Sequence, residues 1–329
     1  MYDKEYKSLT LRLGFAVLLM LVLLQGLMTL LGWGQLLFEA LLIEKVADIL
    51  YWSLYNLFYM LSFMLPVPFF MLISCKKGWQ RMELGVRFPH RFALMATACV
   101  GMILAAGQIN SLLVAPFSGE SASTDMILDM ISPDKGYMVV LVFVMIVIVP
   151  AFCEEFLFRG LVLGNLLPYG KGVAVIGSAL LFAAMHQNFA QFLYTAVAGI
   201  LMGLLYAESR SIWPSTLVHM LNNLLSFVQM ILFARIENEM TAGRIVLCIN
   251  LAVIGAAIAS IAVLLCLAKR EKKEPERDEG MFGHIDLPEQ PRELLPGVAV
   301  RKFFSPSIIV FLSLSFLIAL FNLLLENLL

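Results

Sequence analysis

Long apolar runs separated by short polar segments dominate the pattern of this 329-residue chain. A helix needs about 20 mainly apolar residues to cross roughly 30 Å of hydrocarbon. The pattern therefore predicts an all-α fold, a polytopic transmembrane helical bundle of about nine spans (eight to ten). The predicted spans are residues 13–31, 49–73, 92–114, 137–158, 173–188, 191–207, 212–234, 245–268 and 307–325.

The stretch from Tyr137 to Leu167 is apolar throughout except for one charged cluster. At about 1.5 Å per residue, it is longer than a single straight crossing needs. Long helices bend or break mainly at proline and glycine. We therefore expect an irregularity near Pro150, Gly160 or Gly164.

The composition is that of an integral membrane protein. The chain is 60% hydrophobic and only 14% charged, whereas soluble domains carry roughly 25% charged residues. Its net charge of -1 indicates no nucleic-acid partner. Lys and Arg concentrate on the segments that alternating crossings place on the side of the N-terminus, which predicts a multi-pass cell-membrane protein with a cytoplasmic N-terminus. The one long polar stretch, Lys269–Lys302, is predicted to be a cytosolic linker.

The cysteines show no paired spacing that would indicate a disulfide or a metal site. They stand singly in or beside apolar runs, so we interpret them as small packing residues. Cys153, directly before Glu154, leaves a thiol nucleophile as a minor alternative. The cysteines are Cys75, Cys99, Cys153, Cys248 and Cys266.

Three short polar fragments interrupt the apolar runs. A charge at the bilayer centre costs at least about 2.5–3.5 kcal/mol on insertion scales, so ionisable residues at that depth are functional candidates. Two carboxylates, an arginine, two histidines and an asparagine together suit a hydrolytic site. The candidates are Glu154, Glu155, Arg159, His186, His219 and Asn223.

Each fragment also has a purely structural explanation. Glu155 and Arg159 are spaced i, i+4 and would pair as a buried ion pair that locks two helices. Glu154 projects about 100° away from Glu155 on a helix, so it gains no cation on its own face. It therefore requires another partner.

The histidines have similar alternatives. His186 fits a core histidine bonded to a carbonyl, and His219 with Asn223 fits a hydrogen-bonded bridge between helices. Counted from the predicted inner boundaries, Glu154, His186 and His219 lie about 20, 21 and 12 Å deep. Tilted helices would bring these depths together in one cavity.

The three fragments, in this order and spacing, resemble the CPBP family of intramembrane proteases, the type II CAAX protease and bacteriocin-processing family also called Abi. The matching text is Glu-Glu-Phe-Leu-Phe-Arg-Gly at 154–160, Phe-Ala-Ala-Met-His at 182–186 and Ser-Ile-Trp-Pro-Ser-Thr-Leu-Val-His-Met-Leu-Asn-Asn at 211–223. The resemblance divides the chain into N-terminal transmembrane helices (1–136), a protease core (137–232), a transmembrane helix (233–268), a charged linker (269–306) and a C-terminal transmembrane helix (307–329).

The resemblance implies a hydrolase that cuts peptide bonds at membrane depth. By motif position, Glu154 is the catalytic carboxylate and His186 helps it to hold and deprotonate a water molecule. His219 and Asn223 stabilise the oxyanion. The second carboxylate and the arginine of the first motif support these groups.

A metal-dependent version of this site is an alternative. His186, His219 and Glu154 would provide the two histidines and one glutamate of a catalytic zinc site. The chain has no His-Glu-x-x-His helix, and we rank metal-free, glutamate-activated water ahead of one zinc ion.

The sequence thus predicts an intramembrane endopeptidase whose partners are the lipid bilayer and a membrane protein or peptide substrate. The alternative is a catalytically silent CPBP-fold protein that acts by binding, in bacteriocin self-immunity or in regulation of a membrane partner. All six motif residues are intact, which favours the enzyme. A transporter would show inverted repeats, and the pattern has none. The short loops are typical of a bacterial protein. Because prenylated substrates require a eukaryotic-type lipidation system, we rank leader or mature peptides ahead of them. The sequence does not predict the oligomeric state.

Overall fold

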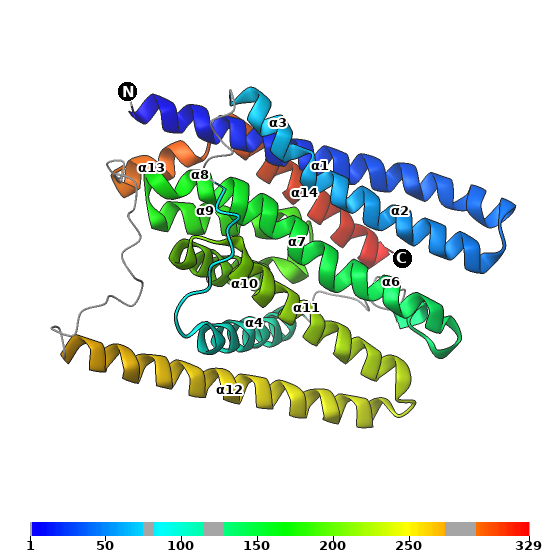
Figure 1. Cartoon of the computed structure of the whole chain (residues 1–329). Helices are drawn as coiled ribbons and strands as arrows, with labels where there is room; N and C mark the ends of the chain where they lie inside the picture. The colour runs from blue at the N-terminus through cyan, green and yellow to red at the C-terminus, as the bar shows by residue number, and fades with distance from the viewer. Residues whose placement is uncertain (1, 75–81, 115–127, 274–293, 329) are drawn as a thin grey trace.

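The protein is a bundle of long helices (Figure 1). The computed structural model describes residues 2–74, 82–114, 128–273 and 294–328. Within these ranges all regular secondary structure is helical, which confirms the predicted all-α fold.

Two of the sequence predictions reach beyond these ranges. Most of the linker predicted at 269–306 lies outside the described residues, and so does Cys75. The other four cysteines are free thiols.

The long helices are α1 (Tyr2–Leu41), α2 (Glu44–Met64), α4 (Phe92–Val114), α9 (Lys171–Met185), α10 (Phe189–Ser209), α11 (Ile212–Arg235), α12 (Glu239–Lys273) and α14 (Pro306–Leu328). The shorter ones are α3 (Pro66–Ile73), α6 (Val139–Phe143), α7 (Val149–Glu155), α8 (Gly164–Leu166) and α13 (Pro296–Phe303). The 3-10 helices are η2 (Pro133–Met138) and η5 (Leu167–Tyr169), and the π-helices are η3 (Val144–Ile148) and η4 (Phe156–Leu163).

Across the described ranges, 8 helical stretches are long and apolar enough to cross a membrane. The chain is therefore a multi-pass membrane protein. The count falls at the lower end of the predicted range because α9, which corresponds to the predicted span 173–188, has only 15 residues. Its length of about 22 Å is less than the roughly 30 Å of a hydrocarbon core.

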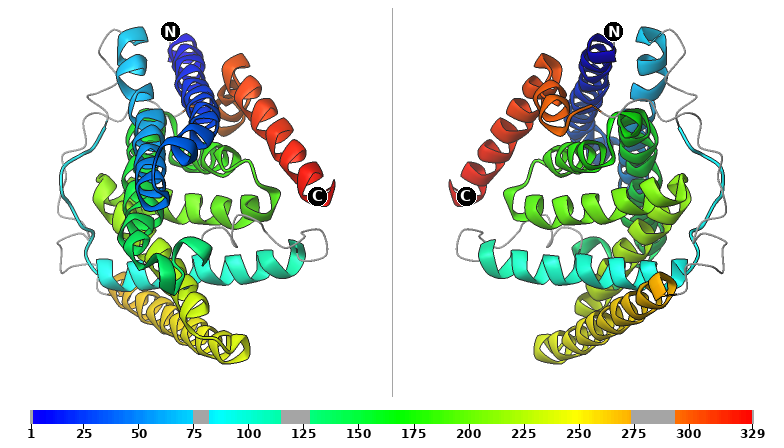
Figure 2. Two further views of the ribbon diagram at one scale, coloured as in Figure 1. Left: turned by 90° about the vertical axis from the view of Figure 1, so that its right-hand side faces the viewer. Right: turned by 90° about the vertical axis from the view of Figure 1, so that its left-hand side faces the viewer.

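The segment from η2 to α11 lies in the middle of the bundle (Figures 1 and 2). Helices α1, α2 and α14 cover one side of it, with α1 packed against both α2 and α14. Helix α4 packs against α10 on the other side and carries α12 on its outer face. The central segment is thus enclosed by helices from both ends of the chain.

The stretch Asp134–Tyr169 continues as one apolar helical segment with two π-helical insertions. The first, η3, ends just before Val149 and Pro150, and the second, η4, contains Gly160. Proline has no N–H for the helical ladder, and π-turns are a common way to absorb such a defect without ending the helix. The predicted irregularity is therefore present as widened turns and not as a break.

Helices α9 and α10 approach closely at Gly199. A Cβ atom at this position would lie 2.9 Å from both Cα and Cβ of Ala179, which is closer than real Cβ contacts. We predict that Gly199→Ala forces the helices apart and destabilises the protein by about 1–3 kcal/mol. The measurement is the midpoint of thermal unfolding in detergent. The control is Gly172→Ala in α9, where the added Cβ has no atom within 4 Å, and equal midpoints for the two variants would contradict the prediction.

Candidate active site

Three charged side chains of the central segment are buried together. Glu154 and Glu155 end α7, and Arg159 lies one turn later in η4. Their exposed fractions are 3%, 0% and 0%. Buried charges are tolerated when they are paired and hydrogen-bonded. The partners of these three groups therefore define the site.

Glu155 and Arg159 form a fully buried ion pair. Nη1 of Arg159 lies 2.8 Å from Oε1 of Glu155. The guanidinium also stands 4.3 Å from the ring centroid of Phe182, and its Nη2 donates to the backbone carbonyl of Gly199 at 3.4 Å. The ion pair predicted from the i, i+4 spacing is thus present. Through its contacts with Phe182 and Gly199, Arg159 also links η4 to α9 and α10.

Glu155 also orients His219 of α11. Nδ1 of His219 lies 3.1 Å from Oε1 of Glu155. Because an ionised carboxylate only accepts, Nδ1 carries the proton in this contact, and Nε2 is turned toward Glu154. The distance from Nε2 to Oε2 of Glu154 is 3.9 Å. This separation is too long for a direct hydrogen bond.

The two oxygens of Glu154 have different surroundings. Oε1 accepts a hydrogen bond from the hydroxyl of Tyr59, which comes from α2. Oε2 is buried, has no hydrogen-bond partner among the described residues and faces His219. A water molecule about 2.8 Å from each of Oε2 and Nε2 would fit the 3.9 Å gap geometrically.

His186 lies at the turn between α9 and α10. It follows the last residue of α9, and Gln187 then takes a left-handed conformation with φ 52°. Asn188 begins the next helix, because its side chain accepts a hydrogen bond from the N–H of Ala190 at 2.7 Å. This short turn fixes the position of the His186 backbone.

The imidazole of His186 reaches the same site. Its Nδ1 is bonded to the carbonyl of Phe182 at 2.9 Å, which leaves Nε2 available. The Phe182 ring meets His186 edge-on at 5.0 Å between centroids and His219 at 6.0 Å. His186 is also within electrostatic range of Glu154 and Arg159. The carbonyl bond expected of a structural histidine is present, and the ring also shares the contact with Phe182 that His219 makes.

Asn223 is bound differently from the other candidates. Its Nδ2 donates to the backbone carbonyl of Ile146 at 3.0 Å. Pro150 has no N–H to offer this carbonyl four residues before it, so the proline leaves an acceptor for Asn223. The contact fastens α11 to η3. The predicted oxyanion role would require the amide to exchange this carbonyl for the substrate.

No group of three His, Cys, Asp or Glu side chains in the described ranges is arranged to hold a metal ion. The zinc alternative relied on Glu154, His186 and His219. Nδ1 of His186 and Nδ1 of His219 are bonded to a carbonyl and a carboxylate, as is usual for metal-binding histidines. The described residues nevertheless do not bring the two Nε2 atoms and Glu154 together as a group of three ligands, so we derive no step through a zinc ion.

Residues 136–225 match the model of a protein family described as type II CAAX prenyl endopeptidase, Rce1-like. This match covers less than half of the chain, and it supports membership of the CPBP family. The matched residues, named the CPBP segment below, include every predicted site residue and lie close to the predicted core of 137–232. No curated protein and no solved structure matches the chain.

Two side chains of this CPBP site were not among the predicted site residues. Tyr59 lies outside the CPBP segment. Phe182 is the first residue of the motif at 182–186, but it was not predicted to be a site residue. The signal for Tyr59 is a column of aromatic residues four apart in α2, formed by Tyr55, Tyr59 and Phe63. Such a column is more often a packing surface, and only its tertiary contact with Glu154 distinguishes it.

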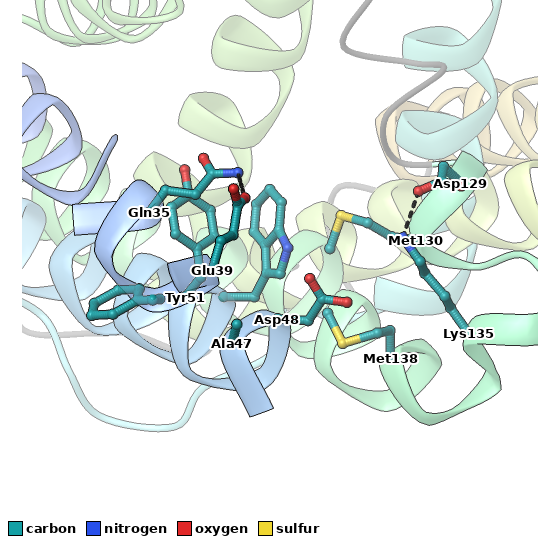
Figure 3. Close-up of a pocket in the computed structure, with 11 residues that line it drawn as sticks. Gln35, Glu39, Ala47, Asp48, Tyr51, Asp129, Met130, Lys135 and Met138 are labelled. Atoms are coloured by element: carbon teal, nitrogen blue, oxygen red, sulfur yellow. Dashed lines mark hydrogen bonds and ion pairs between the residues drawn. The ribbon is translucent and has the colours of Figure 1, made fainter. Parts of the chain in front are cut away.

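A polar pocket of about 160 Å³ lies elsewhere, between α1, α2 and the start of the central segment (Figure 3). Its charged groups are already paired. Lys135 lies 2.8 Å from Asp129, Gln35 donates to Glu39 at 2.8 Å, and Asp48 accepts from a tyrosine hydroxyl at 3.0 Å. Each of these charged groups therefore has a hydrogen-bond partner, although those of Glu39 and Asp48 are uncharged. None of the CPBP motif residues lines this pocket.

An apolar groove of about 350 Å³ borders the His186 turn. It lies between α9, α10 and α14 and includes Gln187 among its lining residues. Phe192 and Phe316, at its edge, are 39% and 55% exposed. The groove is therefore open to the outer surface of the bundle beside the histidine.

Proposed function

We propose that the protein is an intramembrane endopeptidase that hydrolyses peptide bonds of a membrane-associated protein or peptide. The observation that carries this proposal is the unpartnered Oε2 of Glu154, buried and 3.9 Å from Nε2 of His219. A carboxylate and an imidazole separated in this way suit a water molecule that is held by both groups. Family membership supports a protease in general.

Glu154 acts as the general base. It takes a proton from the water, and the resulting hydroxide adds to the carbonyl carbon of the scissile bond. The C–N bond then breaks as the leaving nitrogen receives the proton from Glu154. A positioned base of this kind contributes about a hundredfold to ten-thousandfold to the rate.

The two histidines stabilise the tetrahedral intermediate as imidazolium ions, because Nδ1 of each ring already donates to its partner and only a proton on Nε2 makes the second nitrogen a donor. His219 faces the same gap as Glu154, and Glu155 fixes its ring orientation through Nδ1. His186 lies beside them with Nε2 available. Donors held in place in a water-poor site favour the developing oxyanion strongly, because they need little reorganisation. Arg159 holds Glu155 charged in this position.

The substrate is an apolar peptide segment that reaches the site from within the membrane. The groove beside the His186 turn supports this assignment, because its lining is mostly apolar and it is open at the bundle surface. We infer that the N-terminus is cytoplasmic, from the distribution of Lys and Arg along the sequence. Leader or mature peptides fit this arrangement without a lipid modification.

The test compares membranes that contain the wild type with membranes that contain Glu154→Gln, by proteomic identification of new peptide N-termini. We expect a set of termini that depends on Glu154. If the two samples yield identical termini under all growth conditions, the catalytic proposal fails and the binding-protein alternative replaces it.

We predict that the active protein contains no stoichiometric zinc. The chemistry above uses only Glu154 and the histidines, and among the described residues no group of three His, Cys, Asp or Glu is arranged to hold a metal ion. Elemental analysis of purified protein with confirmed cleavage activity is the measurement. One zinc per active chain would overturn the metal-free mechanism, and incubation with a chelator serves as the matched control.

A further inference from the structure

One contact in the site comes from a helix that the family match does not include. The hydroxyl of Tyr59 donates a hydrogen bond to Oε1 of Glu154. Tyr59 belongs to α2, whereas the CPBP segment begins at residue 136. Helix α2 packs against both α7 and η4, which carry the two glutamates and the arginine. The N-terminal helices therefore touch the proposed base directly.

The position of the Tyr59 hydroxyl is set by its neighbours in α2. Its ring stacks on Phe63 at 4.7 Å between centroids and on Tyr55 at 6.5 Å. Residues four apart share a helix face, so these rings form a column along the face of α2 that meets α7. A ring packed on both sides loses little further freedom when its hydroxyl bonds to Glu154.

This hydrogen bond fixes the plane of the Glu154 carboxylate. The terminal torsion of a glutamate is broad, so an unrestrained carboxylate would rotate over a wide range of angles. With one oxygen (Oε1) bound by Tyr59, the other (Oε2) is held facing Nε2 of His219. The plane of the carboxylate, and with it the place of the attacking water, follows from the Tyr59 contact.

A similar arrangement holds the turn that carries His186. Gln25 of α1 donates to the side-chain oxygen of Gln187 at 2.5 Å, and Asn322 of α14 donates to its backbone carbonyl at 3.3 Å. Both helices lie outside the CPBP segment. Helices from both ends of the chain therefore hold the two halves of the site.

We propose that Tyr59 is a positioning residue that fixes the catalytic orientation of Glu154, so that α2 is part of the catalytic unit. This inference rests on the proposed function, because it assigns to Glu154 the role of base. Tyr59 acts through Glu154 and need not touch the substrate.

The decisive variant is Tyr59→Phe, which removes the hydroxyl and keeps the stacked ring. The matched control is Tyr55→Phe, one turn earlier on the same face of α2. The probe is fluorescein-labelled casein in detergent micelles. We expect kcat to fall about tenfold to a hundredfold for Tyr59→Phe, as misplaced catalytic groups do. KM should stay at the wild-type value, whereas the unfolding midpoint should fall modestly, because the buried Oε1 of Glu154 loses its donor. Tyr55→Phe should leave all three quantities unchanged.

A second background tests whether Tyr59 acts through Glu154. Glu154→Asp keeps a carboxylate but withdraws it from the Tyr59 hydroxyl. If the proposal is right, adding Tyr59→Phe to Glu154→Asp causes no further loss of kcat, because coupled residues are non-additive. Equal fractional losses in both backgrounds would mean that Tyr59 acts elsewhere, and this outcome would overturn the inference.

An infrared measurement separates this inference from the proposed function. The difference spectrum between wild type and Glu154→Gln isolates the carboxylate bands of Glu154. These bands should shift in Tyr59→Phe and stay in place in Tyr55→Phe, whether or not casein is cleaved. Unshifted bands overturn the positioning role. Shifted bands together with full activity of Glu154→Gln would overturn the catalytic proposal alone.

Discussion

Glu154→Gln should lower the cleavage of labelled casein by at least about a hundredfold, the lower end of what a positioned general base contributes. Glutamine has the shape of glutamate and still accepts the hydrogen bond from Tyr59 through its oxygen. It cannot take a proton from water, so the loss should appear in kcat and not in the unfolding midpoint. The measurement is the initial rate of casein cleavage with the purified protein in detergent.

The control for this variant is a similar substitution at a surface position, which leaves both Glu154 and the fold intact. Glu208→Gln meets this need, because Glu208 pairs with Lys171 at 3.0 Å at the rim of the α9–α10 hairpin. Exposed pairs contribute about 0–1 kcal/mol. Glu208→Gln should cleave casein at the wild-type rate. If Glu154→Gln cleaved it at the same rate as Glu208→Gln, the assignment of Glu154 as the base would be contradicted.

Arg159→Met should destabilise the protein by about 3–5 kcal/mol, because it leaves the carboxylate of Glu155 buried without its cation. The pair has no exposed surface, so water cannot replace the guanidinium. The variant also loses the contact with Phe182 and the hydrogen bond to Gly199. The measurement is the unfolding midpoint in detergent, which should fall sharply together with the yield of folded protein.

The double variant Glu155→Leu with Arg159→Met separates stability from function. Replacement of both members of a buried pair by apolar residues is often neutral or stabilising. We expect the double variant to recover most of the lost stability. It should remain inactive, because Nδ1 of His219 loses the carboxylate that orients it. Recovery of activity along with stability would show that the pair has only a structural role.

The helical spans followed from the sequence because burial in hydrocarbon demands long apolar runs with internally bonded backbones. The length of α9 is the exception. The predicted span extended to residue 188, but the helix ends at Met185, because Gln187 adopts a left-handed conformation and Asn188 caps the next helix. The polar residues His186, Gln187 and Asn188 thus form the turn that ends the helix.

Pro150 is a similar case. A proline predicts a local defect, and the structure places a π-helical turn just before it. The sequence does not predict which group donates to the carbonyl of Ile146, which Pro150 leaves without its helical N–H donor. The structure assigns it to Asn223, 77 positions apart from Ile146.

The sequence by itself determined which residues are too polar for their apolar surroundings, because a charge in hydrocarbon is energetically costly and is therefore a functional candidate. It therefore indicated the glutamates, the arginine and the histidines. Only the tertiary structure decided how their atoms are shared, with Oε1 of Glu154 bound by Tyr59 and Oε2 directed at His219. Hydropathy reports the cost of placing one residue in the membrane, whereas a hydrogen bond depends on the relative placement of two helices that no local pattern encodes.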